Sequence, residues 1–108
     1  NYTIRIIDDS TFVFDFQPKS TVLSLFLEGD FTAFQDQFLQ LIDDVLAGKS
    51  KEEEMTGNST NVVFQKDMTT IEDLFLEGEP TVCRIQTKEL RALMDEWIQK
   101  RQEFLKQK

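Results

Sequence analysis

The strongest constraint on the fold is an exact repeat of five residues, Leu-Phe-Leu-Glu-Gly, at Leu25–Gly29 and again at Leu74–Gly78. Shifting the chain by 49 positions aligns the two pentapeptides, and 10 of the 23 residues from 10 to 32 are then identical to those from 59 to 81. A chance coincidence of polar turns and apolar runs accounts for this match less well than duplication does. The sequence therefore predicts two diverged copies of one strand–strand–helix unit.

Strand patterns open each copy. Residues 2–7 and 11–16 alternate with a period of two and are rich in β-branched and aromatic side chains, and a short polar turn separates them. In the second copy, residues 51–56 and 59–64 flank Gly57-Asn58, a connection that suits a tight turn. Both patterns predict antiparallel hairpins.

A helix is predicted over residues 32–47. Thr32 and Gln35 have the spacing of a capping box, in which each side chain bonds a backbone amide near the other. Gly48 follows the last residue, where a left-handed conformation can end a helix. The apolar side chains between these ends lie on one helical stripe, namely Phe34, Phe38, Leu41, Ile42 and Val45.

The second copy contains a further strand and a second helix. Residues 80–85 have the character of a short strand that the first copy lacks, and Thr87 is in a position to cap the helix that follows. The apolar stripe of that helix consists of Leu90, Leu93, Met94, Trp97 and Phe104. The segments 21–29 and 69–78 are short and apolar, so periodicity leaves them open between strand and short helix.

These elements predict one small α+β domain over residues 1–108, with an internal repeat of 1–48 and 49–108. Two antiparallel β-hairpins and two helices would arise from the duplicated β-β-α unit, with the helices packed on the sheet. No apolar run approaches the roughly 18 residues that a membrane helix needs. Cys83 is the only cysteine, which fits a reducing compartment, and we expect a cytoplasmic protein.

The charge is negative and unevenly placed. The formal net charge is −8; residues 1–81 carry five basic and 16 acidic side chains, whereas residues 82–108 carry seven and four. Such a field repels phosphate backbones, so we expect no direct binding of nucleic acid. It attracts a basic partner and speeds the encounter with it. The simpler role of this charge is to keep the domain soluble.

The residues needed for catalysis are missing from the sequence. There is no histidine, the usual general base and the commonest zinc ligand. Without a histidine to activate it, Cys83 is expected to fill a small apolar space rather than act as a nucleophile. Glu28 and Glu77, the glutamates of the repeated pentapeptide, are the candidates for a catalytic carboxylate pair, and nothing in the sequence brings them together. We therefore predict no enzymatic activity, no cofactor and no metal site.

Apolar, glycine and tryptophan positions resemble those of a known family. They are Leu25-x-Leu27-x-Gly29-x-Phe31-Thr32-x-Phe34, Val45–Gly48, Gly57-Asn58 before Val62–Phe64, Thr69–Ile71, and Leu90-x-x-Leu93-Met94-x-x-Trp97. Over about residues 22–104 this pattern resembles the immunity proteins of bacterial contact-dependent growth inhibition systems. The resemblance implies a cytoplasmic, stoichiometric inhibitor that neutralises a cognate toxin, often a nuclease, without catalysis of its own.

The charge of the chain agrees with this resemblance. A nuclease presents a positive cleft to bind phosphates, and a small acidic domain without catalytic groups is suited to occlude it. We therefore predict that the partner is a protein toxin domain with a basic surface. Because loops on a rigid scaffold can project charge, we expect loop carboxylates to bind it. The candidates are Asp8, Asp9, Glu28, Asp30, Glu72, Asp73, Glu77 and Glu79, each of which has solvation as its simpler role.

Two other functions remain open at this point. An acidic adaptor domain would expose an apolar patch to another cellular protein, with Phe26 and Phe75 as equivalent candidates, although core positions suit both better. A small-molecule binding module would use a pocket between the two halves of the chain.

Overall fold

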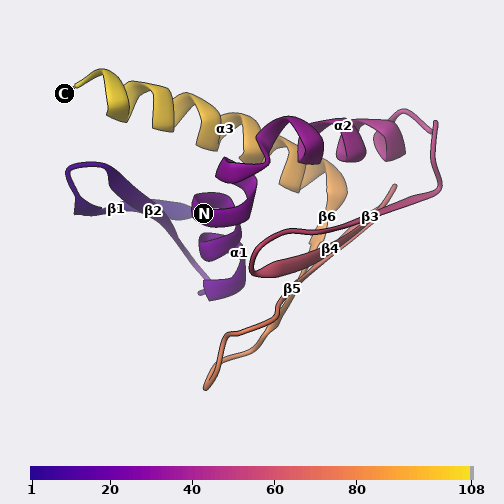
Figure 1. Cartoon of the computed structure of the whole chain (residues 1–108), viewed down its shortest axis with the longest axis horizontal. Coiled ribbons are helices and arrows are strands. Elements are labelled where there is room, and N and C mark those ends of the chain that lie inside the picture. Colours follow the sequence, from indigo (N-terminus) through magenta and orange to yellow (C-terminus); the bar gives the residue numbers. More distant parts are fainter. Residues whose placement is uncertain (108) are drawn as a thin grey trace.

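A computed structural model describes residues 1–107, which form a two-stranded sheet, a four-stranded sheet and the helices that join them (Figure 1). The elements in chain order are β1 (Tyr2–Asp8), β2 (Thr11–Phe16), α1 (Thr21–Phe26), the π-helix η1 (Leu27–Phe31), α2 (Gln35–Leu46), β3 (Glu52–Thr56), β4 (Thr60–Gln65), β5 (Met68–Asp73), β6 (Val82–Gln86) and α3 (Thr87–Lys106). The predicted α+β class is confirmed, as are both hairpins and the short strand before the last helix.

The β1–β2 hairpin packs its aromatic face on α3. Ile4 pairs with Phe14 across the two strands, so the period-two alternation puts the larger side chains on one face. The rings of Phe12 and Phe14 lie 4.6 Å and 5.0 Å from the ring of Trp97, measured between centroids. The turn of this hairpin projects well away from the four-stranded sheet (Figure 1).

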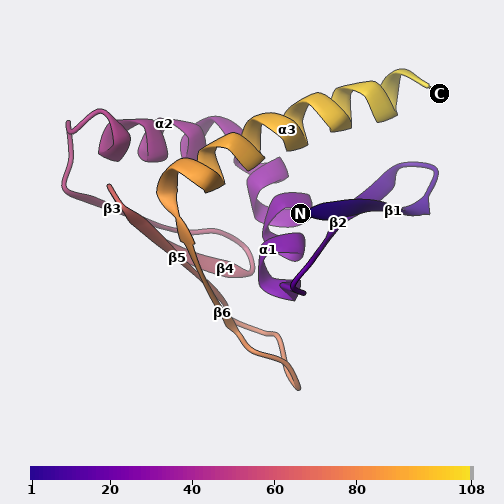
Figure 2. The same cartoon turned by 180° about the vertical axis from the view of Figure 1, so that it is seen from behind.

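The larger sheet has the strand order β3-β4-β5-β6, and every neighbouring pair is antiparallel. Helices α1, α2 and α3 lie on one side of it, and α1 separates it from the β1–β2 hairpin (Figures 1 and 2). The buried side chains of β4 and β5 are Thr60, Val62, Phe64, Thr69, Ile71 and Asp73. The opposite face carries mostly polar side chains and has no helix over it (Figure 1).

Helices α2 and α3 bury the stripes that the sequence predicts, but neither begins with the predicted cap. Trp97, on α3, is 2% exposed, and its indole N–H donates to the hydroxyl of Thr32 at 2.9 Å. That hydroxyl in turn donates to the carbonyl of Leu27 at 2.7 Å. Thr32 is therefore part of an interhelical link, and α2 starts three residues later than expected, at Gln35. Thr87 is likewise buried, and its hydroxyl contacts β4 and β5 instead of capping α3.

The two identical pentapeptides adopt different structures. Leu25–Gly29 runs through the end of α1 into η1, whereas Leu74–Gly78 follows β5 as a loop. Phe26 is 0% exposed and Phe75 is 72% exposed. The segments that the sequence left open are thus helical in the first half and strand followed by loop in the second. Tertiary surroundings, not local propensity, decide between these outcomes.

The carboxylate of Asp30 joins the two halves of the chain. Asp30 is 4% exposed, and its Oδ1 accepts a hydrogen bond from the amide of Asn58 at 3.0 Å. Its Oδ2 accepts from the amides of Ser59 (3.0 Å) and Thr60 (2.9 Å) and from the Thr60 hydroxyl (2.7 Å). The carboxylate at the end of the π-helix therefore satisfies the donors of the β3–β4 turn, including the amide and hydroxyl of the buried Thr60.

Gly57 makes this contact possible. Its φ is not positive, so the position does not need the backbone freedom of glycine. A Cβ at residue 57 would instead lie 2.4 Å from Oδ2 and 2.6 Å from Cγ of Asp30. The absence of a side chain at this turn lets the carboxylate reach the amides.

Hydrogen bonding keeps Asp30 ionised in spite of its burial. Burial raises the pKa of Asp30, but the hydroxyl of Thr60 and the backbone amides of Ser59 and Asn58 more than offset this effect. The pKa of Asp30 therefore lies below its ordinary value of 3.8.

We predict that Gly57→Ala lowers the free energy of unfolding by about 1–3 kcal/mol, because the added methyl group overpacks the turn against Asp30. In an Asp30→Ala background the same substitution should cost at least about 1 kcal/mol less, since the clashing carboxylate is gone. Denaturant unfolding of the four proteins of this cycle measures the coupling. Gly29→Ala is the matched control, because no atom lies within 4 Å of its added Cβ. Equal costs of Gly57→Ala in the two backgrounds would contradict the contact.

We also predict that Asp30 makes the fold acid-sensitive. Because its pKa is lower in the folded state, the unfolded chain takes up the proton first as the pH falls. The stabilisation is therefore complete above about pH 4 and is lost as the pH drops through the folded pKa. Asp30→Asn should cost roughly 1–3 kcal/mol at pH 7. The difference in the free energy of unfolding between Asp30→Asn and the wild type should become smaller below pH 4. Denaturant titrations at a series of pH values from 7 to 2.5 measure it.

Candidate functional site

The eight carboxylates predicted to bind a partner do not form one cluster. Asp8 and Asp9 lie at the turn of the β1–β2 hairpin, at one end of the molecule. Glu72 and Glu77 lie at the end of β5 and in the loop after it, which extends in another direction (Figure 1). Glu28 is half-buried on η1. Glu28 and Glu77, equivalent in the repeat, thus occupy a helix and a loop.

Asp30 and Asp73, two of the predicted contact residues, are buried in this structure rather than exposed on loops. Both carboxylates accept hydrogen bonds from backbone amides inside the fold. The Oδ1 of Asp73, a residue that is 6% exposed, accepts from the amides of Phe75 and Leu76 at 2.9 Å each. Aspartate has a short side chain that readily bonds amides two or three residues further along, and charge counting takes no account of this role.

Glu79 is half-buried and engaged with the first half of the chain. Its carboxylate accepts a hydrogen bond from the Thr21 hydroxyl at 2.8 Å and lies 3.0 Å from the Lys19 ammonium. Hydrogen bonds from Lys19 and then from Thr21 hold the pKa of Glu79 below its ordinary range. This carboxylate therefore links the β5–β6 connection to the start of α1.

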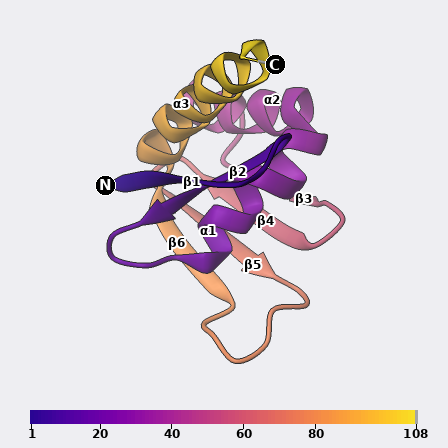
Figure 3. The same ribbon diagram turned by 90° about the vertical axis from the view of Figure 1, so that its left-hand side faces the viewer.

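The β5–β6 loop is fixed at its base by backbone hydrogen bonds. The amide of Asp73 donates to the carbonyl of Thr81 at 2.8 Å, and the amide of Leu74 donates to the carbonyl of Ser59 at 2.8 Å. Gly78 has a φ of 77°, which lets the chain reverse direction at low cost. Together with the carboxylate of Asp73, these contacts define the course of a loop that projects from the sheet, away from the helices (Figures 1 and 3).

This loop and the adjoining strand ends display the largest exposed aromatic side chain of the described residues. Phe75 is 72% exposed; its chain neighbour Leu74 and Val82, which pairs with Glu72 at the end of the strands, are each about half exposed. The exposed carboxylates of Glu72, which pairs with Val82 across the strands, and Glu77 flank them. We call Glu72, Leu74, Phe75, Glu77 and Val82 the Phe75 surface.

The sequence expectation that Phe75 belongs to the core is wrong, whereas the same expectation for Phe26 is confirmed. Nothing within the pentapeptides separates the two residues, because the five residues are identical. The fragment after the second pentapeptide does differ: Pro80 stands where the first copy has Phe31. A proline at that position is unfavourable for continuing a helix, so Pro80 indicates that the second copy differs from the first here.

The Phe75 surface adjoins the uncovered face of the four-stranded sheet. On that face the carboxylate of Glu54 accepts from the side-chain amide of Asn61 at 3.0 Å, and Glu52 accepts from Gln65 at 2.8 Å. Glu72 shares this face with Arg84, which projects from β6. The combined surface is flat, polar and acidic, with one aromatic projection at its end.

Cys83, the single cysteine, has the properties of a partly buried and unreactive thiol. Burial raises the pKa of the Cys83 thiol, although a hydrogen bond with Ser20 acts in the opposite direction. Cys83 lies in an open groove of about 430 Å³ between the β2–α1 segment and β6. Among residues 1–107, no group of three or more His, Cys, Asp or Glu side chains is placed to hold a metal ion.

Comparison with known proteins shows a relative that matches almost the whole chain. The chain is 32% identical over 108 residues to an immunity protein of Bacillus cereus, and the match covers 99% of this chain and 92% of the relative. The chain belongs to the immunity protein family. No protein-family model matches it, and no solved structure does. No helix within residues 1–107 of this family member is long and apolar enough to cross a membrane.

The repeated pentapeptide provides a matched test of the site. We predict that Phe26→Ala lowers the free energy of unfolding by about 3–5 kcal/mol, because it opens a cavity in the core. Phe75→Ala should change it by less than about 0.5 kcal/mol, since the ring lies in solvent. Denaturant unfolding of both variants checks the difference. A cost above 1 kcal/mol for Phe75→Ala would show that the ring packs in the fold.

Proposed function

We propose that this chain binds and neutralises a cognate toxin in the cytoplasm, and that the Phe75 surface is its contact region. The observation that carries the proposal is the full-length similarity to a relative named as an immunity protein. The Phe75 surface is the region of the fold best suited to hold a protein partner. The system to which the pair belongs would be one of contact-dependent growth inhibition.

Phe75 has the properties of a binding anchor. Aromatic side chains that become buried in a partner's pocket supply much of the affinity of protein interfaces. Keeping such a ring 72% exposed on a loop fixed by Asp73 and Gly78 means that little conformational freedom is lost on binding. Leu74 and Val82 add exposed apolar area to this region, and burying that area against a partner would add to the binding free energy.

The carboxylates around Phe75 indicate the kind of partner. Glu72 and Glu77 flank the ring, and Glu52 and Glu54 continue the negative charge over the open sheet face. Such a surface complements a basic cleft of the type that binds phosphates. We therefore infer that the toxin is a nuclease and that the β5–β6 loop occludes its active-site cleft.

An acidic adaptor domain is also expected to expose an aromatic side chain, so Phe75 by itself fits that function as well. Family membership favours the toxin as the partner. The two functions differ in a measurable way, because an adaptor would not protect cells from a toxin.

The experiment begins by sequencing the gene upstream of this chain and then coexpresses the chain with the C-terminal domain which that gene encodes. Wild-type chain should restore growth and bind the purified domain, and Phe75→Ala should weaken binding by about 30-fold or more. Leu105→Ala is the matched control, because Leu105 is a half-exposed apolar residue on α3. Wild-type chain that neither protects cells nor binds the domain would overturn the function.

Charge reversal in the same assay tests the role of the carboxylates. Glu77→Lys should slow association about 3–10-fold and reduce its salt dependence, whereas Glu103→Lys on α3 should not. Full protection with unchanged binding kinetics in both Phe75→Ala and Glu77→Lys would leave the function intact and remove the Phe75 surface from it.

A further inference from the structure

Strand β1 presents an unpaired edge that the proposed toxin contact does not use. It pairs only with β2, so its other edge carries backbone groups without strand partners. Ile4 is 45% exposed and Ile6 is 65% exposed along this strand, and Ile7 lies beside them at a bulge. Such an apolar edge is a template for pairing with a further strand.

The hydrogen-bond pattern identifies which backbone groups face outward. The amide of Gln17 donates to the carbonyl of Asn1 at 2.9 Å, so Asn1 directs its backbone toward β2. In an antiparallel pair the residues alternate between facing the partner strand and facing away from it. Tyr2, Ile4 and Ile6 therefore direct their amides and carbonyls away from β2.

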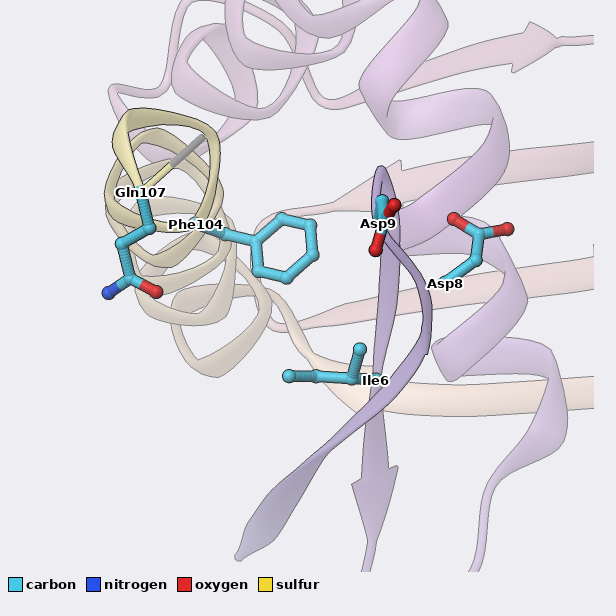
Figure 4. A pocket seen from close by; sticks show the side chains of 5 residues that line it. All are labelled: Ile6, Asp8, Asp9, Phe104 and Gln107. Carbon is cyan, nitrogen blue, oxygen red and sulfur yellow. The ribbon is translucent and has the colours of Figure 1, made fainter.

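The same edge borders an apolar groove beside α3. One hollow of about 480 Å³ is lined by Ile6, the turn of the hairpin, Phe104 and Gln107, and an adjoining one of about 180 Å³ continues along Ile4. Phe104 projects from α3 toward the hairpin, and Ile6 points into the same space from β1 (Figure 4). Side chains of a strand added to β1 would fill this groove.

The other edge strands differ from β1 in charge or in packing. Strand β3 carries three consecutive glutamates, which discourage pairing with another chain. Strand β2 packs against α1 and η1, and strand β6 packs against α1 and α3. In contrast, the one charged side chain between Tyr2 and Ile7 of β1 is Arg5, which pairs with Asp15 of the neighbouring strand at 2.7 Å.

We propose that β1 pairs with β1 of a second copy of this chain in antiparallel orientation. The two-fold axis that relates the copies passes between their Ile4 residues. Outward-facing residues must oppose one another, so Ile4 would lie opposite Ile4 and Tyr2 opposite Ile6. In this register Arg5 faces Thr3 of the other copy. Shifting the register by two residues to pair Ile4 with Ile6 would set Arg5 against Arg5, and like charges directly opposite are unfavourable. The charge pattern thus favours the pairing centred on Ile4 over this shifted one.

The symmetry of this pairing buries the groove as well as the edge. The two hairpins would form one continuous sheet of four strands, β2-β1-β1-β2. A two-fold axis perpendicular to this sheet puts the aromatic faces of both hairpins on the same side, so both α3 helices lie over that side. Ile6 of each copy then lies opposite Tyr2 of the other, beside the groove that Phe104 lines. Lys100 and Glu103 line the smaller hollow, so charges of both signs are present along the contact. The β5–β6 loops remain exposed in both copies, because they project from another part of the molecule (Figure 1).

The first measurement is the mass of the chain in solution by sedimentation, up to about 1 mM, the range in which small interfaces associate. We expect reversible dimers that increase with salt, since salt screens the repulsion between two chains of net charge −8. Ile4→Lys should weaken the dimer at least tenfold, and Val82→Lys, at the exposed end of β6, should not. A chain that stays monomeric, or a dimer unaffected by Ile4→Lys, overturns the proposal.

Disulfide trapping tests the register independently of any folding defect. In a Cys83→Ala background, Ile4→Cys should form a covalent dimer on mild oxidation, because opposed residues have Cα atoms about 5.5 Å apart. Ile6→Cys should not, because residue 6 opposes residue 2. Cross-linking of Ile6→Cys in preference to Ile4→Cys would overturn the proposal.

Discussion

The structure depends on a buried carboxylate that reaches from one half of the chain into the other. Asp30, at the end of the π-helix, satisfies three successive amides of the β3–β4 turn, and Gly57 leaves room for it. The residue that the repeat makes its equivalent, Glu79, reaches in the opposite direction and holds Lys19 and Thr21. Each half therefore supplies one acidic side chain that fastens the other half. The negative charge of the sequence is in part structural.

The sequence predicts most of the regular elements, because they depend on local patterns. The alternation in residues 2–7 and 11–16 and the apolar stripe of α3 specify the elements that the structure contains. The start of α2 was misplaced because the hydroxyl of Thr32 bonds Trp97, 65 residues further along the chain, instead of a nearby amide. A capping pattern indicates a possible bond, and only the packing determines which partner the hydroxyl finds.

The candidate site was less accessible to sequence reasoning. Charge counting selected Glu72 and Glu77, which the structure exposes, together with Asp30 and Asp73, which it buries. It could not select Phe75, because an identical pentapeptide contains the fully buried Phe26. Both rings would gain by leaving water, and the fold offers a core position to one of them. The other remains exposed and is available to a partner.

The β5–β6 loop is anchored through its backbone and through the side chain of Asp73, so its outward residues take no part in holding the domain together. Substitutions at Leu74, Phe75 and Glu77 leave the anchoring bonds in place. The side chains displayed by this loop can therefore change without loss of the contacts that fix its course. In this fold, what the loop presents to solvent is separate from what holds the domain together.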